Sequence, residues 1–385
     1  MAVTPLRVAQ IGTAFMGRAH SQAWLTAGRF FDLPLAPELR VLVGTDPART
    51  AETAARFGWA ESSTDWRAVI ARDDIDLVDI CTPGDTHAEI AIAALAAGKH
   101  VLCEKPLANS VEEAERMTAA AATAAANGIV AMCGFTYRRT PALALARQLV
   151  ADGRLGTIRQ VRAQYLQDWL SDPESPLTWR MDREKAGSGA LGDIAAHSID
   201  TAQWLTGGSI ASVSAILRTF VDERPDASGR GRGRVTVDDA AAFTATFAGG
   251  AADGALGVFE ATRMALGRRN AHRVELSGDQ GSIAFDFERM NELEFYDAGD
   301  PDGLQGFRRI QVTEGSHPYT GSWWPAGHGL GYEHLFTHQV VDLVRAIAGE
   351  QPVAPTFADG LGVQRVLAAI ESSAADESRR TAVAR

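Results

Sequence analysis

An acid and a histidine stand four residues apart, as Asp193 and His197, in the stretch GSGALGDIAAHSIDTAQWLTG. On a helix this spacing places both side chains on one face, one turn apart. A neutral imidazole can remove a proton from a hydroxyl group near neutral pH. The glycines at 187, 189 and 192 let the backbone approach a ligand closely. The pattern favours a proton-transfer site, although a surface Asp–His pair would have the same spacing.

A second group of residues has the spacing of a dinucleotide-binding turn. The stretch RVAQIGTAFMGRAH reads as a strand, a glycine turn and a helix start, with glycines at the first and last positions of the fingerprint. Alanine stands at the middle position, so the motif alone also fits an ordinary strand-to-helix turn. We expect the helix N-terminus to meet a pyrophosphate. The residues expected at the cofactor are Gly12, Ala14, Phe15, Met16 and Gly17.

Asp46, at the end of a second expected strand in VLVGTDPAR, is the candidate for the cofactor's ribose. A carboxylate there accepts hydrogen bonds from the ribose hydroxyls and repels a 2′-phosphate, which favours NAD over NADP. It lies beyond the usual spacing of about 20 residues, and we assign the excess to an insertion, GRFFDLPLAPEL. Asp46 also suits a helix N-cap, because Pro47 follows it. Arg49 keeps NADP open, since an arginine can accept the 2′-phosphate.

The elements that must position these residues follow from the apolar runs. Up to about residue 139, short continuous apolar runs alternate with Ala-rich helical patterns, which predicts a parallel sheet covered on both faces. We therefore expect an α/β fold with a doubly wound Rossmann domain over residues 1–135. Residues 136–385 are expected to form a second α/β domain, for substrate binding and oligomerisation, with a large, mostly antiparallel open sheet. Its last helix, about residues 358–376, can pack back on the Rossmann domain.

Length, charge and cysteine usage narrow the class of protein. A chain of 385 residues can hold two or three domains, and its formal charge of −11 argues against nucleic acid or a membrane surface as partner. No apolar run is long enough to span a bilayer, and the start, MAVTPLRVAQIG, leads us to expect no signal peptide. The three cysteines, at 81, 103 and 133, lack the spacing of a metal site and suit a reducing cytoplasm.

The late stretch GHGLGYEHLFTH raises the question of a metal. His334 and His338 are one helical turn apart, but the order differs from His-Glu-x-x-His and the sequence offers no third ligand. We therefore expect no metal. His328, flanked by glycines after SWWPA, is expected in a loop on the substrate side.

Two stretches, CTPGDTHAEIAIAALAAGKHVLCEKPLA and GSGALGDIAAH, resemble the glucose–fructose oxidoreductase / inositol dehydrogenase / rhizopine catabolism (Gfo/Idh/MocA) family. The resemblance extends over nearly the whole chain and implies an NAD-dependent dehydrogenase of sugars or cyclitols that forms dimers or tetramers. A lysine, an aspartate and a histidine form the catalytic group of the family, which implies these roles for Lys105, Asp193 and His197. Whether the lysine or the histidine is the base stays open. The residues expected beside the cofactor in the first stretch are Thr82, Pro83, His87, Glu104 and Lys105.

The stretches FTYRRTPALALA, YLQDW and PLTWR are similar to a levoglucosan-oxidising branch of that family. This similarity implies oxidation of a secondary hydroxyl, C3 of a pyranose, with NAD. The residues expected around the substrate are Lys105, Tyr137, Gln167, Trp179, Arg180, Asp193, His197 and His328. The alternatives are an inositol or other polyol dehydrogenase, an NADP-dependent sugar reductase of the same family, and a sugar-sensing protein that binds the cofactor without turnover. The intact Lys, Asp and His argue against the last.

Overall fold

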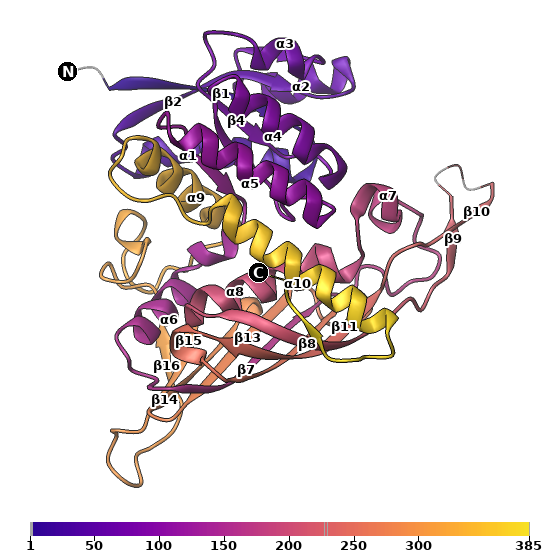
Figure 1. Cartoon of the computed structure of the whole chain (residues 1–385). Helices are drawn as coiled ribbons and strands as arrows, with labels where there is room; N and C mark the ends of the chain where they lie inside the picture. Colours follow the sequence, from indigo (N-terminus) through magenta and orange to yellow (C-terminus); the bar gives the residue numbers. More distant parts are fainter. Residues whose placement is uncertain (1–2, 227, 229, 385) are drawn as a thin grey trace. The chain divides into compact units, whose positions relative to one another are not determined.

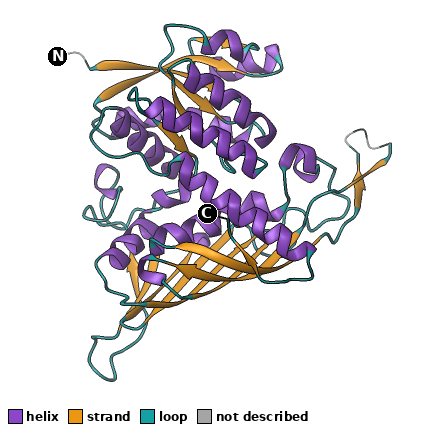
Figure 2. Ribbon diagram, viewed as in Figure 1, coloured by secondary structure: helices purple, strands orange, loops and turns teal. Residues whose placement is uncertain are grey.

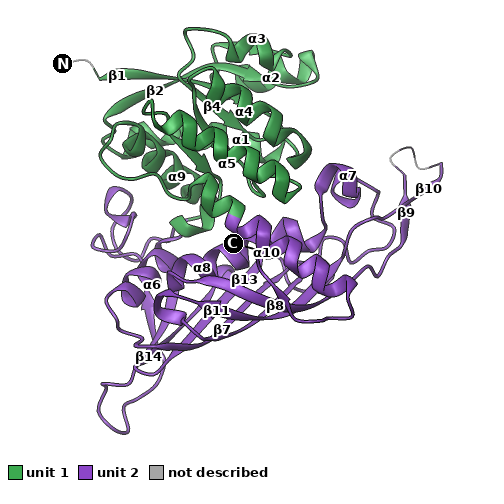
Figure 3. Cartoon of the chain, viewed as in Figure 1, with its two compact units in different colours: residues 1–139, 331–361 green, residues 140–330, 362–385 purple. Residues whose placement is uncertain are grey.

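A computed structural model describes residues 3–226, 228 and 230–384 and divides the chain into two compact units (Figure 3). Unit 1 comprises Met1–Arg139 and Gly331–Leu361, and unit 2 comprises Thr140–Leu330 and Gly362–Arg385. This division differs from a single boundary after residue 135. The difference arises because helix α9 (Tyr332–Ile347) packs against α1 (Phe15–Phe30), so a late segment completes the first unit.

Unit 1 contains the expected parallel sheet. Its six strands have the order β3-β2-β1-β4-β5-β6, and all of the neighbouring pairs are parallel. The order in which the strands follow one another along the chain therefore reverses between β1 and β4, the usual place for a dinucleotide in such a sheet. The strands are β1 (Thr4–Ile11), β2 (Leu35–Val43), β3 (Glu61–Ser63), β4 (Leu77–Ile80), β5 (His100–Cys103) and β6 (Ala131–Cys133).

Helices cover this sheet, as the continuous apolar strands require (Figure 1). Besides α1 and α9 they are α2 (Pro47–Phe57), α3 (Trp66–Ile70), α4 (His87–Ala96), α5 (Val111–Ala125) and the first turn of α10 (Phe357–Ala375). The insertion predicted between the first helix and the second strand is wrong. Helix α1 runs to Phe30 and β2 begins at Leu35, so those residues lengthen both elements. Strand β6 ends at Cys133, and a 3-10 turn, Thr136–Arg139, follows it.

Unit 2 contains a nine-stranded sheet in the order β16-β15-β14-β13-β7-β12-β11-β8-β17. Central β7 runs parallel to β12, whereas its other neighbour and the remaining described pairs are antiparallel, which confirms the mostly antiparallel sheet. The strands are β7 (Ile158–Leu166), β8 (Ser209–Arg218), β11 (Ala240–Ala248), β12 (Leu256–Thr262), β13 (Ala271–Gly278), β14 (Gly281–Asp286), β15 (Glu292–Asp297), β16 (Arg308–Gln311) and β17 (Thr381–Ala382). A separate hairpin, β9 (Glu223–Pro225) and β10 (Arg232–Arg234), occupies the Gly- and Arg-rich segment.

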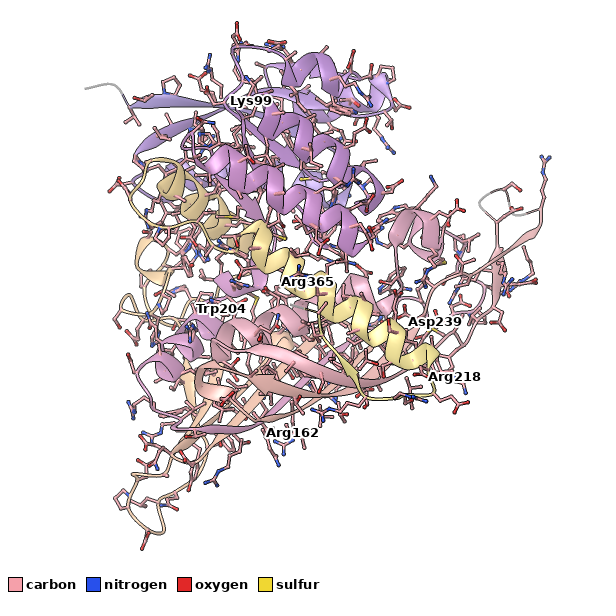
Figure 4. All side chains as sticks on the ribbon, viewed as in Figure 1. Lys99, Arg162, Trp204, Arg218, Asp239 and Arg365 are labelled. Carbon is pink, nitrogen blue, oxygen red and sulfur yellow. The ribbon has the colours of Figure 1, made fainter. Side chains whose placement is uncertain are left out.

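Helices α6 (Pro141–Ala151), α8 (Ala196–Thr206) and the unit 2 part of α10 lie over one face of this sheet (Figure 2). A short helix, α7 (Arg183–Ala186), lies nearer the β9–β10 hairpin. On the opposite face of the sheet, the side chain of Arg162 extends away from the helices (Figure 4). No helix within the described residues has the length and apolar character needed to cross a bilayer.

Candidate active site

The glycine turn of unit 1 has the close backbone contacts that a dinucleotide site needs. Gly12 has φ +118°, and a Cβ there would lie 2.6 Å from the carbonyl oxygen of Cys81. A Cβ on Gly17 would lie 2.1 Å from the carbonyl oxygen of Gly12, so the first turn of α1 can only pack this closely without a side chain. Ala14 offers no side-chain cap to α1, and the helix N-terminus therefore suits an anionic group such as a pyrophosphate. Phe15 beside it is exposed.

Asp46 follows β2 and is exposed at the N-terminus of α2. Its Oδ1 accepts a hydrogen bond from the backbone N–H of Arg49 at 2.9 Å, so the expected N-cap is present. The other carboxylate oxygen of Asp46, Oδ2, is part of the same exposed side chain. An N-cap carboxylate in this position is compatible with a ribose contact, because one oxygen suffices for the cap.

The loops that follow β4 and β5 are tied together by His87. Its Nδ1 lies 3.0 Å from the carbonyl oxygen of Pro106, and its Nε2 lies 2.9 Å from that of Thr82. In the first loop, the hydroxyl of Thr86 donates to the carbonyl oxygen of Pro83 at 2.8 Å. These contacts fix the loops at the carboxyl ends of neighbouring parallel strands, where open α/β sheets bind ligands.

Lys105 is half-buried directly after this β5 end. The preceding Glu104 is buried, and its carboxylate turns inward: Oε1 lies 3.0 Å from Nε2 of His20, and Oε2 accepts the backbone N–H of Lys105 at 3.3 Å. The Glu104 side chain therefore packs inside unit 1. Tyr137 is also buried, in the 3-10 turn that ends the first segment of unit 1.

In unit 2, the helix with the Asp–His pair begins on a buried carboxylate. Asp238 accepts the backbone N–H of Gly189 at 2.7 Å and that of Leu191 at 2.8 Å. A Cβ on Gly189 would lie 1.8 Å from the carbonyl oxygen of Asp238, which explains the need for glycine at this position. The motif is not one continuous α-helix: a π-helical turn, Leu191–Ala195, precedes α8. Such turns are frequent at functional sites.

Arg263, which sequence analysis missed, lies beside Asp193. Its Nη1 is 3.7 Å from Oδ2 of the aspartate, and its Nη2 donates to the carbonyl oxygen of Asp238 at 3.1 Å. The arginine is fully buried, whereas the Asp193 side chain is 28% exposed. A fixed positive charge at this distance favours the ionised carboxylate. The position of Arg263 directly after a strand was the available signal, because Gln167 follows β7 in the same way.

A network of neutral polar groups includes Tyr165, whose ring lies beside His197. Gln167 donates from Nε2 to Oδ1 of Asn270 at 2.8 Å and accepts the indole N–H of Trp169 at 2.9 Å. The hydroxyl of Tyr165 donates to the same Asn270 oxygen at 2.7 Å, and its ring centroid is 5.9 Å from that of His197. These residues meet because the end of β7 and the start of antiparallel β13 lie at one sheet edge. Amide and hydroxyl groups are those a polyol requires. Tyr165 and Asn270 were not predicted.

The other expected substrate residues have local contacts. The guanidinium of Arg180 lies 4.4 Å above the ring of Trp179, within a 3-10 turn. His328 is exposed, and its Nδ1 lies 2.8 Å from the carbonyl oxygen of Pro325. The histidines that raised the metal question belong to α9 of unit 1. Burial lowers the pKa of His338 to about 3, and its Nδ1 faces the carbonyl oxygen of Arg139 at 3.0 Å.

A glycine turn on a 3-2-1-4-5-6 parallel sheet, followed by a second α/β unit with an Asp–His pair, defines a two-domain NAD-binding oxidoreductase. The comparison with known protein families identifies the family to which this oxidoreductase belongs. Residues 6–132 match the model of an oxidoreductase family with an NAD-binding Rossmann fold, and residues 143–284 match that of the GFO/IDH/MocA C-terminal domain. The chain belongs to the Gfo/Idh/MocA family of NAD-dependent oxidoreductases.

Three relatives resemble the chain over nearly its full length. Levoglucosan dehydrogenase of Pseudarthrobacter phenanthrenivorans is 45% identical over 97% of both chains. A structure of levoglucosan dehydrogenase in complex with NADH and levoglucosan has a TM-score of 0.94 and 44% identity, covering 99% of this chain and 100% of that one. The crystal structure of an oxidoreductase domain protein from Kribbella flavida has a TM-score of 0.96 and 63% identity, with coverage of 99% and 100%.

Proposed function

We propose that this enzyme oxidises a secondary hydroxyl of a sugar, C3 of a pyranose such as levoglucosan. The observation that carries the proposal is a set of contacts in unit 2: Arg263 lies beside Asp193, and the ring of Tyr165, which is bonded to an amide network, lies beside His197. The similarity to levoglucosan dehydrogenase along nearly the whole chain supports the same substrate class. Inositols and other polyols offer similar hydroxyl groups and are the alternative substrates.

The catalytic roles follow from the chemistry of each side chain. Bound NAD supplies the hydride acceptor. We assign His197 as the base that removes the hydroxyl proton, and Asp193 as the group that holds the imidazole or a neighbouring substrate hydroxyl. Arg263 keeps Asp193 ionised, and the ammonium of Lys105 stabilises negative charge on the reacting oxygen. Substrate contacts are assigned to Tyr137, Gln167, Trp179, Arg180 and His328.

The cofactor contacts are proposed for the carboxyl edge of the unit 1 sheet. The turn from Gly12 to Gly17 suits the pyrophosphate, and exposed Asp46 suits the adenosine ribose. The loops fixed by His87 suit the nicotinamide half. The proposed cofactor residues are Gly12, Ala14, Phe15, Met16, Gly17, Asp46, Arg49, Thr82, Pro83, His87, Glu104 and Lys105. The three cysteines are buried and form no disulfide, which fits the proposed cytoplasmic location.

A substrate screen with an isotopic control tests the proposal. Purified enzyme and NAD are incubated with levoglucosan, glucose and inositols, and NADH formation is followed by absorbance. The expected result is the highest kcat/KM with a pyranose, and deuterium transfer to the cofactor from levoglucosan labelled at C3. Preferred turnover of an inositol, or preferred reduction of a ketose with NADPH, would assign the enzyme to one of the alternatives. Sugar binding without any turnover would indicate a sensor.

A further inference from the structure

A buried histidine in unit 1 has no part in the assignments above. His20 lies on α1 and is 1% exposed, and each of its ring nitrogens faces a carboxylate. Nδ1 is 2.9 Å from Oδ1 of Asp79 on β4, and Nε2 is 3.0 Å from Oε1 of Glu104 after β5. Asp79 is fully buried and Glu104 is 4% exposed. One imidazole therefore joins the helix that follows the dinucleotide turn to the residue before Lys105.

The hydrogen bonds around this cluster define its protonation. The carboxylate of Asp79 also accepts the indole N–H of Trp24 at 2.8 Å, and that of Glu104 accepts the backbone N–H of Lys105 at 3.3 Å. Because both carboxylates accept these N–H groups, we assign a donor role to both ring nitrogens of His20, which makes the ring an imidazolium. Burial alone would lower the pKa of His20, but the Asp79 carboxylate outweighs it, and the pKa lies well above its usual value.

A metal ion is the alternative for this cluster, because His20, Asp79 and Cys81 present ligand atoms within 4.8 Å of one another. Two observations favour the proton network. Both nitrogens of His20 already face carboxylates, and burial raises the pKa of the Cys81 thiol, which keeps it protonated. Its S–H donates to Oδ1 of Asp79 at 3.5 Å. The ring of Phe336 from α9 also lies beside His20, with 5.4 Å between the ring centroids. His20 therefore has one apolar neighbour besides the titratable Asp79, Cys81 and Glu104.

The carboxylate of Glu104 is held in place from several directions. A Cβ on Gly134 would lie 2.7 Å from Oε1 of Glu104, so the glycine leaves the space that the carboxylate occupies. The backbone N–H of Glu104 donates to the carbonyl oxygen of Ile80 at 2.9 Å. The bond from His20 is the charged contact that fixes the carboxylate, and this carboxylate accepts the N–H of Lys105.

We propose that His20 is a positioning residue, which as a buried imidazolium bridging Asp79 and Glu104 holds the turn of Lys105 against α1. The proposal rests on the proposed function, in which Lys105 acts on the substrate oxygen. It assigns no contact between His20 and substrate or cofactor. Its effect is on the placement and the electrostatic surroundings of the lysine.

The first test changes the number of hydrogen-bond donors that the side chain at position 20 presents to the two carboxylates. H20Q replaces two donor nitrogens with one NH2 donor group and one acceptor oxygen, so an acceptor then faces a carboxylate oxygen of Glu104 or Asp79. We expect kcat to fall by about 10²-fold, as displacement of a catalytic group by about 1 Å can cause, with little change in the KM for the sugar. In H20Q/E104Q, the new amide at 104 can donate to the new amide oxygen at 20. The double variant should therefore recover at least about tenfold of the lost kcat. A double variant no better than H20Q would contradict the bridge.

The second test observes the lysine directly, because the chain has only three lysines, Lys99, Lys105 and Lys185. Reductive methylation with ¹³C-formaldehyde gives one dimethylamine NMR signal for each, assigned with K105R. In H20Q we expect the chemical shift of the Lys105 signal to change, while the signals of Lys99 and Lys185 stay in place. H338Q is the matched control, since His338 is equally buried in the same unit but bonds to Arg139. It should leave the Lys105 signal in place.

An unchanged Lys105 signal in folded H20Q would overturn the proposal. If H20Q does not fold, E104Q removes the charge from the other partner of the same bond, and an unchanged Lys105 signal there has the same meaning. This readout needs no turnover. Failure of the proposed function would instead appear as wild-type turnover in K105A, so the two failures can be told apart.

Discussion

Three side chains carry the proposed chemistry, and the substitution of each has an expected kinetic result. His197→Ala and Lys105→Ala should lower kcat more than they raise KM, because both groups act mainly in the transition state. Loss of a general base typically costs about 10²–10⁴-fold in rate. Asp193→Asn should reduce turnover while NADH binding, measured by fluorescence, is retained. In the wild type, log kcat/KM should rise with pH until the base is deprotonated. Near-wild-type turnover and an unchanged pH profile in His197→Ala would place the base elsewhere.

The preference between cofactors depends on one carboxylate. Asp46 is exposed after β2, where it would repel a 2′-phosphate, so kcat/KM should be higher with NAD than with NADP. Asp46→Ala should reduce this preference. Because Asp46 also caps α2, the melting temperature must be recorded with the kinetics, and Asp65→Ala, which removes the N-cap of α3, is the control. A preference for NADP that is unaffected by Asp46→Ala would rule out this assignment.

At the scale of an element, the start of the catalytic helix depends on the absence of a side chain. Gly189→Ala would place a Cβ 1.8 Å from the carbonyl oxygen of Asp238, so the backbone must move and the bonds from Asp238 to the helix start must lengthen. We expect a loss of about 2 kcal/mol or more in the free energy of unfolding, together with reduced kcat. The matched control is Gly362→Ala in α10, where a Cβ meets nothing within 4 Å. Equal urea midpoints for the two variants would contradict the expectation.

The elements also explain which site residues the sequence could predict. Lys105, Asp193 and His197 lie in local motifs, and Gln167 follows an alternating strand, so each has a signal within a few residues of itself. Asn270 has no such signal, and Arg263 has only its position directly after a strand. They reach the site only because β7 lies between parallel β12 and antiparallel β13, and that strand order is set by contacts far apart in the chain.

The same distinction between local and distant contacts explains which parts of the fold could be predicted from the sequence. The parallel sheet of unit 1 could be predicted because each strand is followed by its own helix. The π-helical turn could not be predicted, because its sequence, LGDIA, continues the helical pattern, and the bonds from Asp238 come from a distant strand connection. His20 lies on the apolar face of α1 beside Ala23 and Trp24, where only the positions of Asp79 and Glu104 reveal its function.

At the scale of the whole molecule, stability should depend on pH through two buried histidines. Burial lowers the pKa of His272 and of His338 to about 3, so both are neutral in the folded state. In the unfolded chain they bind protons near pH 6.5. The stability that they contribute is therefore complete above about pH 6.5 and is lost as the pH falls toward 3. Each should contribute a slope of about 1.4 kcal/mol per pH unit within that window.

Urea unfolding at a series of pH values between 7 and 4 measures this slope. In His272→Gln, the free energy of unfolding should change less steeply with pH than in the wild type, by the contribution of one histidine. His317→Gln, at a more exposed position, should have the same slope as the wild type. The same slope in His272→Gln and in the wild type would show that this ring does not titrate as expected.

The outer face of the unit 2 sheet is expected to pair with another copy of the chain. Its apolar residues Ile216, Leu256 and Val258 are 58%, 49% and 48% exposed, and such faces need cover. Light scattering at micromolar concentration should give a dimer or a tetramer of the 41.0 kDa chain. Val258→Glu should lower the measured mass, whereas Leu266→Glu, in a loop outside the sheet, should not. A wild-type monomer under these conditions would contradict the prediction.

The composition of unit 1 from two distant segments has a consequence for how the chain is made. When the ribosome has released residues 1–139, all six strands of the parallel sheet have been synthesised, but α9 has not. Until it arrives, Arg139 lacks Asp342, its partner at 3.1 Å, and α1 lacks its neighbouring helix. Almost two hundred residues of unit 2 emerge in between. The nascent cofactor unit therefore stays incomplete while unit 2 is being translated, and it exposes an apolar surface of the kind that chaperones bind.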